Sequence, residues 1–511
     1  MSVITNFFDT GALSHPDSVC FEDQAGTKLT YSEVVGVTSQ VARAVKDRGL
    51  GEGYHGAVLS GNIITALVAI LGVCRGGGVW LPVNARNSAV DNASFLDDMD
   101  CEVLFYQEKW ADQVEVIREQ VPSIKLFVCL DGEGDDSLAG FIDEYSSEPV
   151  TPNWDLDATQ LIMGTGGTTG RPKGAMLSSR NLAAAYAIHM SVFAIDAQMT
   201  VLAAAPISHT SAILAVPYLA RGGRLYLVDG VEPQSLMRDI EDQRVNMMFL
   251  PPTVLYMLLA EPNVREFDFS SLKYILYGAA PTAPQKLREA IEVFGPVMLQ
   301  GYGQMEVMSG ISALVPDDHF IDGKPAPDSR LMSAGRRHPF TRVALRTDDD
   351  QITTEPGITG EIIVQGDVVM KGYYNNPRAS EESSFNGWHC TGDIGVFDEE
   401  GFLTLVDRKK DMIISGGFNV FSTEVEASIM SHALVKDCAV IGVPHEKWGE
   451  AVTAFIEVRP GADLDPEELR LYVRERLGGV KTPKTIHVLD ELPRSTVGKV
   501  LKKELRQLRQ M

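Results

Sequence analysis

Short apolar segments alternate with helical segments over about the first 300 residues, and this alternation constrains the fold more than any other feature of the sequence. Residues 57–60 and 79–83 have the composition of buried strands, and residues 63–74 between them form an almost entirely apolar helical segment. Strand, helix and strand at this spacing indicate parallel strands joined by helical crossovers. The continuous apolar helix indicates burial on most sides. The chain is therefore predicted to be an α/β protein with parallel-rich sheets.

The same alternation continues along the chain. A helix opens after Leu29, where Thr30 and Glu33 have the spacing of a capping box. Further strands are predicted at residues 102–106, 126–130, 201–205, 224–228, 247–250 and 274–277. Further helices are predicted at residues 181–193, 233–243, 253–260 and 284–294.

The texture of the sequence changes at about residue 341, where short strand-like pieces are separated by turn residues. This change predicts a small β-subdomain, and a compact α/β unit of about 100 residues follows it. We predict an N-terminal domain over residues 1–406, with the β-subdomain at about 341–406, and a small C-terminal α/β domain over residues 407–511. The hinge between them is predicted near Lys410.

Composition limits the class of protein. The 511 residues are 44% hydrophobic and 22% charged, which is typical of a soluble globular protein of several domains. No segment has about 18 apolar residues without polar breaks, so no membrane span is predicted. The net charge of −24 leaves no dominant basic face for nucleic acid. The N-terminus lacks a basic segment before an apolar core, and the six cysteines are scattered, so we expect a cytoplasmic location, reduced thiols and no zinc site.

A segment rich in glycine and threonine lies between residues 164 and 174, after a strand-like run and before a helix-like run. Glycine lets backbone N–H groups turn toward a ligand, threonine hydroxyls donate hydrogen bonds, and Arg171 and Lys173 add positive charge. The Walker phosphate loop is excluded, because the Gly-Lys-Ser/Thr ending is missing and Pro172 interrupts the segment. The spacing alone therefore predicts an anion-holding loop, with a flexible surface loop as the alternative.

Several separated stretches together resemble one known family, the adenylate-forming superfamily of acyl-CoA synthetases, peptide-synthetase adenylation domains and luciferases. Residues 165–174 are similar to its phosphate loop, and Gly-Tyr-Gly-Gln-Met-Glu at residues 301–306 is similar to its Tyr-Gly-x-Thr-Glu segment. Further matches, to its nucleotide, hinge and C-terminal lysine motifs, lie at residues 388–393, 407–411, 416–420 and 493–499. The matches follow the order of the family from about residue 29 to residue 506, which makes the resemblance specific.

The resemblance implies a reaction in two steps at one site. A carboxylate attacks the α-phosphate of ATP to give acyl-AMP and pyrophosphate, and a thiol then displaces AMP. The first step brings an anion against a triphosphate, so the site must supply positive charge and fixed geometry. The residues that the resemblance assigns to ATP or AMP are Thr165, Gly166, Gly167, Thr168, Thr169, Gly170, Lys173, Gly278, Ala279, Ala280, Gln300, Gly301, Tyr302, Gly303, Met305, Asp393, Arg408 and Lys499.

The resemblance also implies individual roles. Glu306 would bind Mg²⁺, which prefers few carboxylates together with phosphate oxygens and water. Lys499 would offset charge at the α-phosphate and the carboxylate, and His209 would gate the carboxylate pocket. Asp393 would accept hydrogen bonds from both ribose hydroxyls. Each role has a structural alternative. Glu306 and Lys499 could be ordinary solvated side chains, His209 a histidine of the core, and Asp393 an aspartate of a turn.

Two positions depart from the family pattern. The family commonly has serine where this chain has Gly166, and threonine where this chain has Met305. Each departure removes a hydroxyl donor to the phosphates. We expect slower adenylation unless backbone groups or water replace these donors.

Uncharged residues form the predicted acid pocket, namely His209, Thr210, Ala212, Met305 and Met308. Relatives that activate amino acids often carry an aspartate at the position of Thr210, where it pairs with the substrate ammonium. We therefore predict an acid without an α-amino group and with an apolar body, and fatty, aryl and polycyclic acids all remain open.

The predicted activity is that of an acyl-CoA ligase that uses ATP, Mg²⁺ and coenzyme A. In the family the C-terminal domain rotates between the two steps, so Lys410 would be the hinge, and Gly416 and Gly417 would border the path of the pantetheine thiol. One alternative is a stand-alone adenylation enzyme that loads the acid onto a carrier protein, and another is a degenerate binding protein. The oligomeric state is left open, with a homodimer as one option.

Overall fold

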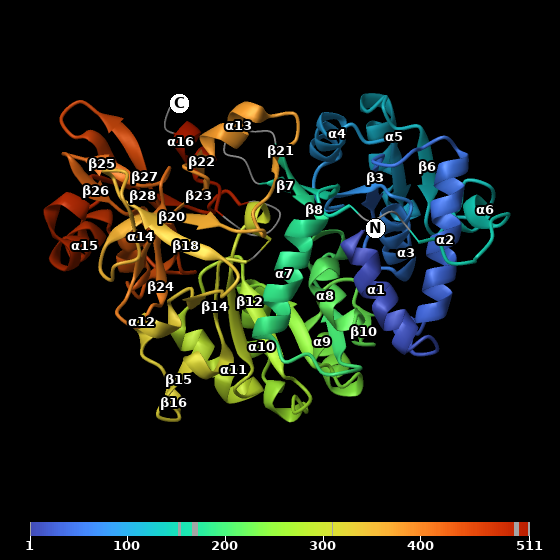
Figure 1. Cartoon of the computed structure of the whole chain (residues 1–511). Coiled ribbons are helices and arrows are strands. Elements are labelled where there is room, and N and C mark those ends of the chain that lie inside the picture. The colour runs from blue at the N-terminus through green and yellow to red at the C-terminus, as the bar shows by residue number, and fades with distance from the viewer. Residues whose placement is uncertain (1, 152–154, 166–171, 309, 495–499, 509–511) are drawn as a thin grey trace. The chain divides into compact units, whose positions relative to one another are not determined.

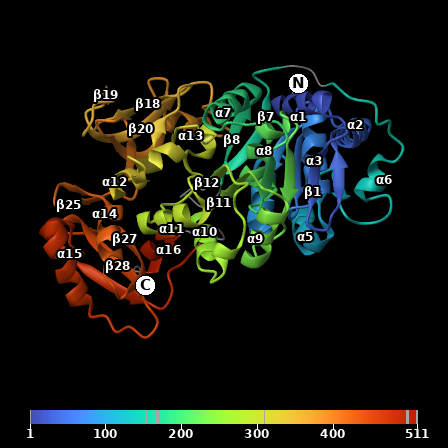
Figure 2. The same cartoon turned by 90° about the horizontal axis from the view of Figure 1, so that it is seen from below.

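The computed structural model describes residues 2–151, 155–165, 172–308, 310–494 and 500–508. The chain divides into two compact units, Met1–Val343 with Val364–His389, and Ala344–Ile363 with Cys390–Met511. Figures 1 and 2 show mixed sheets and helices in both units. The predicted α/β fold class, with large parallel-rich N-terminal sheets and a small C-terminal part, is confirmed.

A nine-stranded sheet forms one half of the first unit. Neighbouring strands pair in parallel in the order β1, β10, β9, β11, β12 and β13. Antiparallel strands lie at both edges, β2 beside β1, and β14 and β17 beyond β13. The strand order is β17 (Arg336–Arg337), β14 (Ser312–Leu314), β13 (Met298–Tyr302), β12 (Tyr274–Gly278), β11 (Met247–Leu250), β9 (Thr200–Ala203), β10 (Arg224–Leu227), β1 (Val19–Asp23) and β2 (Lys28–Thr30).

A seven-stranded sheet forms the other half of this unit. Strands β7, β4, β3, β5 and β6 pair in parallel, whereas β21, β8 and β7 pair antiparallel. The strand order is β21 (Gly372–Tyr373), β8 (Lys173–Ser178), β7 (Thr159–Thr165), β4 (Val79–Pro82), β3 (His55–Leu59), β5 (Val103–Tyr106) and β6 (Leu126–Cys129). A separate hairpin joins β15 (Phe320–Ile321) and β16 (Lys324–Pro325).

Helices lie between the two sheets and on their outer faces. The central apolar core contains residues of both sheets and of α1, α2, α3, α7 and α8, whereas α9, α10 and α11 cover the outer face of the nine-stranded sheet and α4 and α5 cover that of the seven-stranded sheet. The helices of this unit are α1 (Val3–Ser14), α2 (Tyr31–Asp47), α3 (Ile64–Arg75), α4 (Ala89–Asp98), α5 (Ala111–Gln120), α6 (Leu138–Ile142), α7 (Ser179–Val192), α8 (Ala212–Leu219), α9 (Pro233–Asp242), α10 (Pro252–Leu259), α11 (Pro284–Phe294), α12 (Asp328–Leu331) and α13 (Pro377–Glu382).

Two local predictions are confirmed in these helices. Thr30 caps α2, because its side chain accepts a hydrogen bond from the Glu33 backbone N–H while the Glu33 carboxylate accepts one from the Thr30 N–H. Helix α3 is buried along almost its whole length, as its continuous apolar sequence indicates. Among the described residues, no helix has the length and apolar character needed to cross a membrane.

Two further sheets lie mainly in the second unit, although residues 342–343, 364–365 and 384–389 of the first of them belong to the first unit. The first contains β19 (Ile352–Thr353), β18 (Arg342–Arg346), β20 (Thr359–Gln365), β23 (Trp388–Phe397) and β24 (Leu403–Arg408), and β22 (Ser384–Phe385) pairs with the start of β23. The other has the order β26 (Phe418–Val420), β25 (Ile413–Ser415), β28 (Gly449–Val458) and β27 (Val435–His445), with β29 (Thr485–Leu489) parallel to β28. Its helices are α14 (Ser422–Met430), α15 (Pro466–Lys481) and α16 (Lys502–Leu508).

The predicted domain boundary at residue 406 stays a prediction. In the structure the strands at 344–363 and 390–406 belong to the same compact unit as the C-terminal hundred residues. Helix α14 (Ser422–Met430) belongs to the compact α/β unit predicted after the β-subdomain. All six cysteines are free thiols, and five of them are buried while Cys390 is partly exposed.

Candidate active site

The predicted anion-holding segment begins and ends in an antiparallel pair of strands. Thr165 ends β7 and Lys173 begins β8, and the two residues lie opposite each other in the strand register. The helix predicted at residues 181–193 is present as α7, which begins at Ser179. Strand β8, which the sequence did not predict, lies between the segment and this helix because its backbone pairs with β7. The predicted loop residues lie outside the described residues, namely Gly166, Gly167, Thr168, Thr169 and Gly170.

The Lys173 side chain is half-buried and lies over an aromatic ring. Its Nζ is 5.0 Å from the centroid of the Tyr373 ring, which is within the range of a cation–π contact. Strand β21 brings Tyr373 to this position by pairing with β8, with Tyr373 opposite Ala175. The Tyr373 ring therefore holds the Lys173 ammonium at the end of the β7–β8 hairpin that adjoins the loop segment.

The Glu306 carboxylate is buried near this hairpin. Glu306 belongs to a short 3₁₀ turn, η4 (Met305–Val307), which follows β13 and packs against both β7 and β8. The side chain is 7% exposed, and the Tyr373 hydroxyl donates a hydrogen bond of 2.8 Å to its Oε1. Burial, and then the nearby Glu306 carboxylate, raise the pKa of Tyr373, so the phenol stays protonated and donates.

The donor set at Glu306 suits magnesium. The described residues contain no group of three or more histidine, cysteine, aspartate or glutamate side chains that could hold a metal ion by themselves. Mg²⁺ is usually bound by one or two carboxylates, with substrate phosphates and water completing the octahedron. A single buried carboxylate beside the β7–β8 hairpin fits that pattern, and when bound the ion would neutralise phosphate charge.

The residues at 278–280 and 300–303 that the resemblance assigns to ATP or AMP lie at the carboxyl ends of two parallel strands, where ligands of open α/β sheets bind. Gly278 ends β12 and pairs with Gly301 of β13. A Cβ on Gly278 would lie 2.7 Å from the Gly301 carbonyl oxygen, so glycine at this position is needed for strand pairing as well as for any close approach of a base. Ala279 follows with φ of +65°, and the predicted neighbours Ala280, Gln300, Tyr302 and Gly303 extend the same edge.

The residues of the predicted acid pocket lie in two short turns and beside them. His209 and Thr210 belong to one turn of π-helix, η2 (Ile207–Ser211), and their side chains lie outside the description. Ala212 is buried at the start of α8. Met305 and Met308 are partly buried and pack against the central apolar core, and Met308 has a left-handed backbone with φ of 41°. The described side chains among these residues are apolar.

The predicted ribose-binding pair lies in the second unit. Asp393 of β23 and Arg408 of β24 are opposite each other across an antiparallel pair, and the Arg408 Nε lies 2.9 Å from the Asp393 Oδ1. The Asp393 side chain is buried, whereas Arg408 is exposed. The carboxylate oxygens of Asp393 can accept hydrogen bonds from hydroxyl groups.

The remaining predicted residues also lie in the second unit. Lys410 is exposed in the turn between β24 and β25, and Gly416 and Gly417 form the tight turn between β25 and β26 with φ of 62° and 81°. Lys499 lies outside the described residues. The roles assigned to these residues stay predictions.

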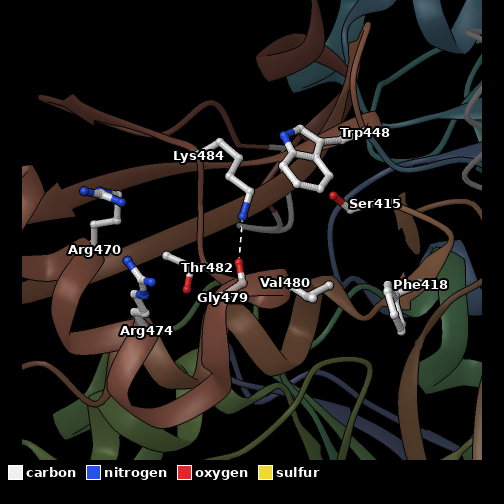
Figure 3. A pocket seen from close by; sticks show the side chains of 10 residues that line it. Ser415, Phe418, Trp448, Arg470, Arg474, Gly479, Val480, Thr482 and Lys484 are labelled. Carbon is white, nitrogen blue, oxygen red and sulfur yellow. Dashed lines mark hydrogen bonds between the residues drawn. The ribbon is translucent and has the colours of Figure 1, made fainter.

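Sequence reasoning missed a pocket beside Gly416, which Figure 3 shows. Its volume is about 500 Å³, and it is lined by Ser415, Gly416, Phe418, Trp448, Arg470, Arg474, Gly479, Val480, Thr482 and Lys484. The Lys484 Nζ donates a hydrogen bond of 2.7 Å to the Gly479 carbonyl oxygen and lies 5.7 Å from the Trp448 ring centroid. Burial, and then the charges of Arg470 and Arg474, lower the pKa of Lys484. The pocket thus combines cations with an aromatic wall.

Comparisons with known proteins identify the family. The sequence profile of the AMP-binding enzymes matches residues 8–374, and that of the AMP-binding enzyme C-terminal domain matches residues 424–499. The chain belongs to this family, the adenylate-forming superfamily.

Curated relatives cover nearly the whole chain. Medium/long-chain-fatty-acid–CoA ligase FadD8 of Mycobacterium tuberculosis is 34% identical and covers 94% of this chain and 86% of its own length. Feruloyl-CoA synthase of an Amycolatopsis species is 34% identical over 94% of each chain. 2-Succinylbenzoate–CoA ligase of Geobacillus kaustophilus is 31% identical over 99% of this chain and 98% of its own.

Solved structures of the same fold also match nearly the whole chain. The amide bond synthetase McbA from Marinactinospora thermotolerans has a TM-score of 0.86 at 28% identity, with 99% of each chain covered. ATP-bound MatB from Rhodopseudomonas palustris has a TM-score of 0.88 at 29% identity, also with 99% of each chain covered. The family and the ligases among its relatives make this chain an AMP-forming acyl-CoA ligase, a class of enzyme that uses ATP and coenzyme A.

Proposed function

We propose that this ligase activates a hydrophobic carboxylic acid without an α-amino group and passes its acyl group to coenzyme A. In the first step an oxygen of the acid attacks the α-phosphorus of ATP, and the bond to the pyrophosphate oxygen breaks. In the second step the thiol attacks the acyl carbon, loses its proton, and AMP leaves with the electron pair of the C–O bond. Fatty, aryl and polycyclic acids are all compatible with this proposal.

The pocket beside Gly416 is the observation that favours coenzyme A over a carrier protein as the acceptor. Coenzyme A carries an adenine, a diphosphate and a 3′-phosphate, whereas the pantetheine arm of a carrier protein carries a single phosphodiester. Three cationic side chains line the pocket, Arg470, Arg474 and Lys484, and Trp448 supplies a flat ring. Cations match the phosphates, and an indole ring can stack on adenine.

The position of the pocket also suits the second step. A Cβ on Gly416 would lie 3.2 Å from the Trp448 ring, and the backbone there has φ of +62°. Any larger residue would be strained and would push toward the pocket wall. The glycine turn therefore leaves room beside the ring for an extended arm such as pantetheine.

The acid is proposed to be apolar because the described side chains of the predicted acid pocket are apolar. Met305 and Met308 present thioether side chains packed against the central core, and methionine adapts its shape to irregular apolar ligands. Position 210 is a threonine, so the chain offers no carboxylate there to pair with a substrate ammonium.

The remaining roles complete the proposal. Lys173 and Thr165 would hold the terminal phosphates together with the loop between them, Glu306 would bind Mg²⁺, and Asp393 would hold the ribose. Lys499 would neutralise the charge that develops at the α-phosphate, since fixed cations stabilise such transition states. We propose a cytoplasmic location for this reaction.

A panel of acids tests the proposal. The enzyme is incubated with ATP, Mg²⁺ and each acid, and pyrophosphate release is measured with and without coenzyme A. Formation of acyl-CoA from apolar acids is the expected result. Adenylate formation without transfer to coenzyme A would select the carrier-protein alternative, and no pyrophosphate release across fatty, aryl and polycyclic acids would contradict the proposal.

A further inference from the structure

Tyr373 contacts two residues of the proposed nucleotide site, Glu306 and Lys173, that lie far from it in the sequence. The Tyr373 hydroxyl donates to the buried Glu306 carboxylate at 2.8 Å, and its ring lies beneath the Lys173 ammonium at 5.0 Å. All three residues belong to the first unit. The same side chain therefore contacts the carboxylate proposed for the metal and the cation at the end of the phosphate-loop hairpin.

We propose that Tyr373 is a positioning residue, whose hydroxyl orients Glu306 for the metal and whose ring orients Lys173 for the phosphates. The inference rests on the proposed role of Glu306 as the Mg²⁺ ligand. A phenol is a suitable donor for this purpose because it fixes one carboxylate oxygen without adding positive charge. A lysine or arginine in its place would compete with the metal for the same anion.

The backbone holds Tyr373 tightly enough for such a role. Its N–H donates to the Ser380 Oγ at 2.8 Å, and its strand β21 pairs with β8, the strand that begins with Lys173. The neighbouring Met370 N–H donates to the Glu306 carbonyl oxygen at 2.8 Å. Both the backbone and the side chain of Glu306 are thus bound to the segment 370–373.

Burial makes the hydrogen bond consequential. Glu306 is 7% exposed and Tyr373 is 8% exposed, so water competes little for either partner, and a carboxylate in such surroundings depends on its donor for orientation. Hydrogen bonds between a neutral donor and a charged acceptor are among the stronger ones in proteins. Removal of the hydroxyl should leave Glu306 in place but free to rotate away from the metal.

Three variants separate the two contacts. Tyr373→Phe removes only the hydroxyl and keeps the ring beneath Lys173, whereas Tyr373→Leu removes both. Tyr374→Phe is the matched control, because the adjacent Tyr374 hydroxyl donates at the same distance of 2.8 Å to Asp100, an exposed carboxylate away from Glu306.

The readout is metal affinity rather than turnover. Mn²⁺ replaces Mg²⁺, and its binding to the full-length enzyme with a non-hydrolysable ATP analogue is followed by the loss of the free-ion electron paramagnetic resonance signal. We expect Tyr373→Phe to weaken Mn²⁺ binding about tenfold, the scale for one hydrogen bond to a charged group, with unchanged affinity for the analogue in the absence of metal. Tyr373→Leu should also weaken metal-free analogue binding, about two- to fivefold for a partly exposed cation–π contact. Tyr374→Phe should change neither quantity.

A further variant, Glu306→Gln, makes the outcomes distinguishable. In its background Tyr373→Phe should cause no additional loss of Mn²⁺ affinity, because the two residues act through one hydrogen bond. Normal Mn²⁺ affinity in Tyr373→Phe, with weak binding in Glu306→Gln, overturns the positioning role and leaves the proposed metal ligand intact. Normal Mn²⁺ affinity in Glu306→Gln overturns both the positioning role of Tyr373 and the proposed role of Glu306 as the metal ligand. Unchanged metal-free analogue binding confirms that Tyr373→Phe is folded, and an equal loss of metal-free and metal-dependent binding in that variant shows a structural role only and overturns the proposal.

Discussion

Replacement of Trp448 by alanine should weaken the use of coenzyme A without affecting the first half-reaction. Trp448 lines the pocket beside Gly416 and is 36% exposed, so about two-thirds of its surface is already covered by protein. Stacking of a base on an aromatic side chain contributes about 1–3 kcal/mol, and the partial cover favours the lower part of that range, about 1–2 kcal/mol. Because 1.4 kcal/mol corresponds to a factor of ten, we expect the KM for coenzyme A to rise about 5- to 30-fold.

The assay measures the half-reactions separately. Pyrophosphate release reports acyl-AMP formation, and thioester formation starts from purified acyl-AMP with either coenzyme A or pantetheine, which lacks the nucleotide. The Trp448→Ala variant should lose most of the preference of the wild-type enzyme for coenzyme A over pantetheine. An unchanged KM for coenzyme A, or an equal loss with both acceptors, would refute the assignment of the pocket to the nucleotide.

A charge substitution gives a second arm of the same test with a matched control. Arg474 and Arg476 lie two residues apart on α15, but Arg474 lines the pocket whereas the Arg476 guanidinium lies 3.4 Å from the Tyr472 ring centroid. Arg474→Met should raise the KM for coenzyme A several-fold, and more at low than at high ionic strength, because salt screens a partly exposed charge pair. Arg476→Met should leave it unchanged.

Four further results are expected. Lys499→Ala should lower the adenylation rate by about 10²-fold or more, the scale for one preorganised donor, while thioester formation from purified acyl-AMP survives; equal losses in both steps would contradict the assignment. Lys410→Pro, which fixes φ at the predicted hinge, should impair thioester formation more than adenylation in the same two assays. Gly166→Ser combined with Met305→Thr should speed pyrophosphate release, and no gain would show that the two departures from the family pattern are harmless. Burial lowers the pKa of His189 to about 3, so the unfolded chain takes up this proton first as the pH falls below about 6.5, and stability present above that pH is lost toward pH 3. At pH 5 the loss is about 2 kcal/mol, and His189→Phe should flatten the decline of the melting temperature between pH 6.5 and 5; an identical slope would contradict the buried neutral imidazole.

Local features were predictable because their causes are local. The capping box of Thr30 and Glu33 is encoded within four residues, and the buried helix α3 needed only its apolar composition. The parallel sheets followed from the alternation of strands and helices. The strand after the predicted phosphate loop was not predicted, because residues 173–178 form a strand through their pairing with β7 and β21.

The site shows the same limit more sharply. Motif order located Glu306 and Lys173, but their common partner Tyr373 depends on a strand pairing between residues about 200 positions apart. The pocket around Trp448 combines residues from β25, α15 and the ends of neighbouring strands, and no single segment contains enough of it to form a motif. Tyr373 lies in the segment Gly-Tyr-Tyr-Asn-Asn-Pro. The composition of this segment is typical of turns and does not indicate a contact with Glu306 or Lys173.

The distribution of the cysteines has a practical consequence for observing this enzyme at work. Five thiols are buried, and burial raises the pKa of Cys20, Cys74, Cys101 and Cys438 further from the neutral range. Cys390, partly exposed in β23, is the natural attachment point for a maleimide dye, although burial raises its pKa too, so labelling will be fastest in mildly alkaline buffer. A single fluorophore could thus be placed on the second unit of the wild-type chain, and a second one on an introduced surface cysteine of the first unit would allow energy transfer between the two units to be followed during turnover.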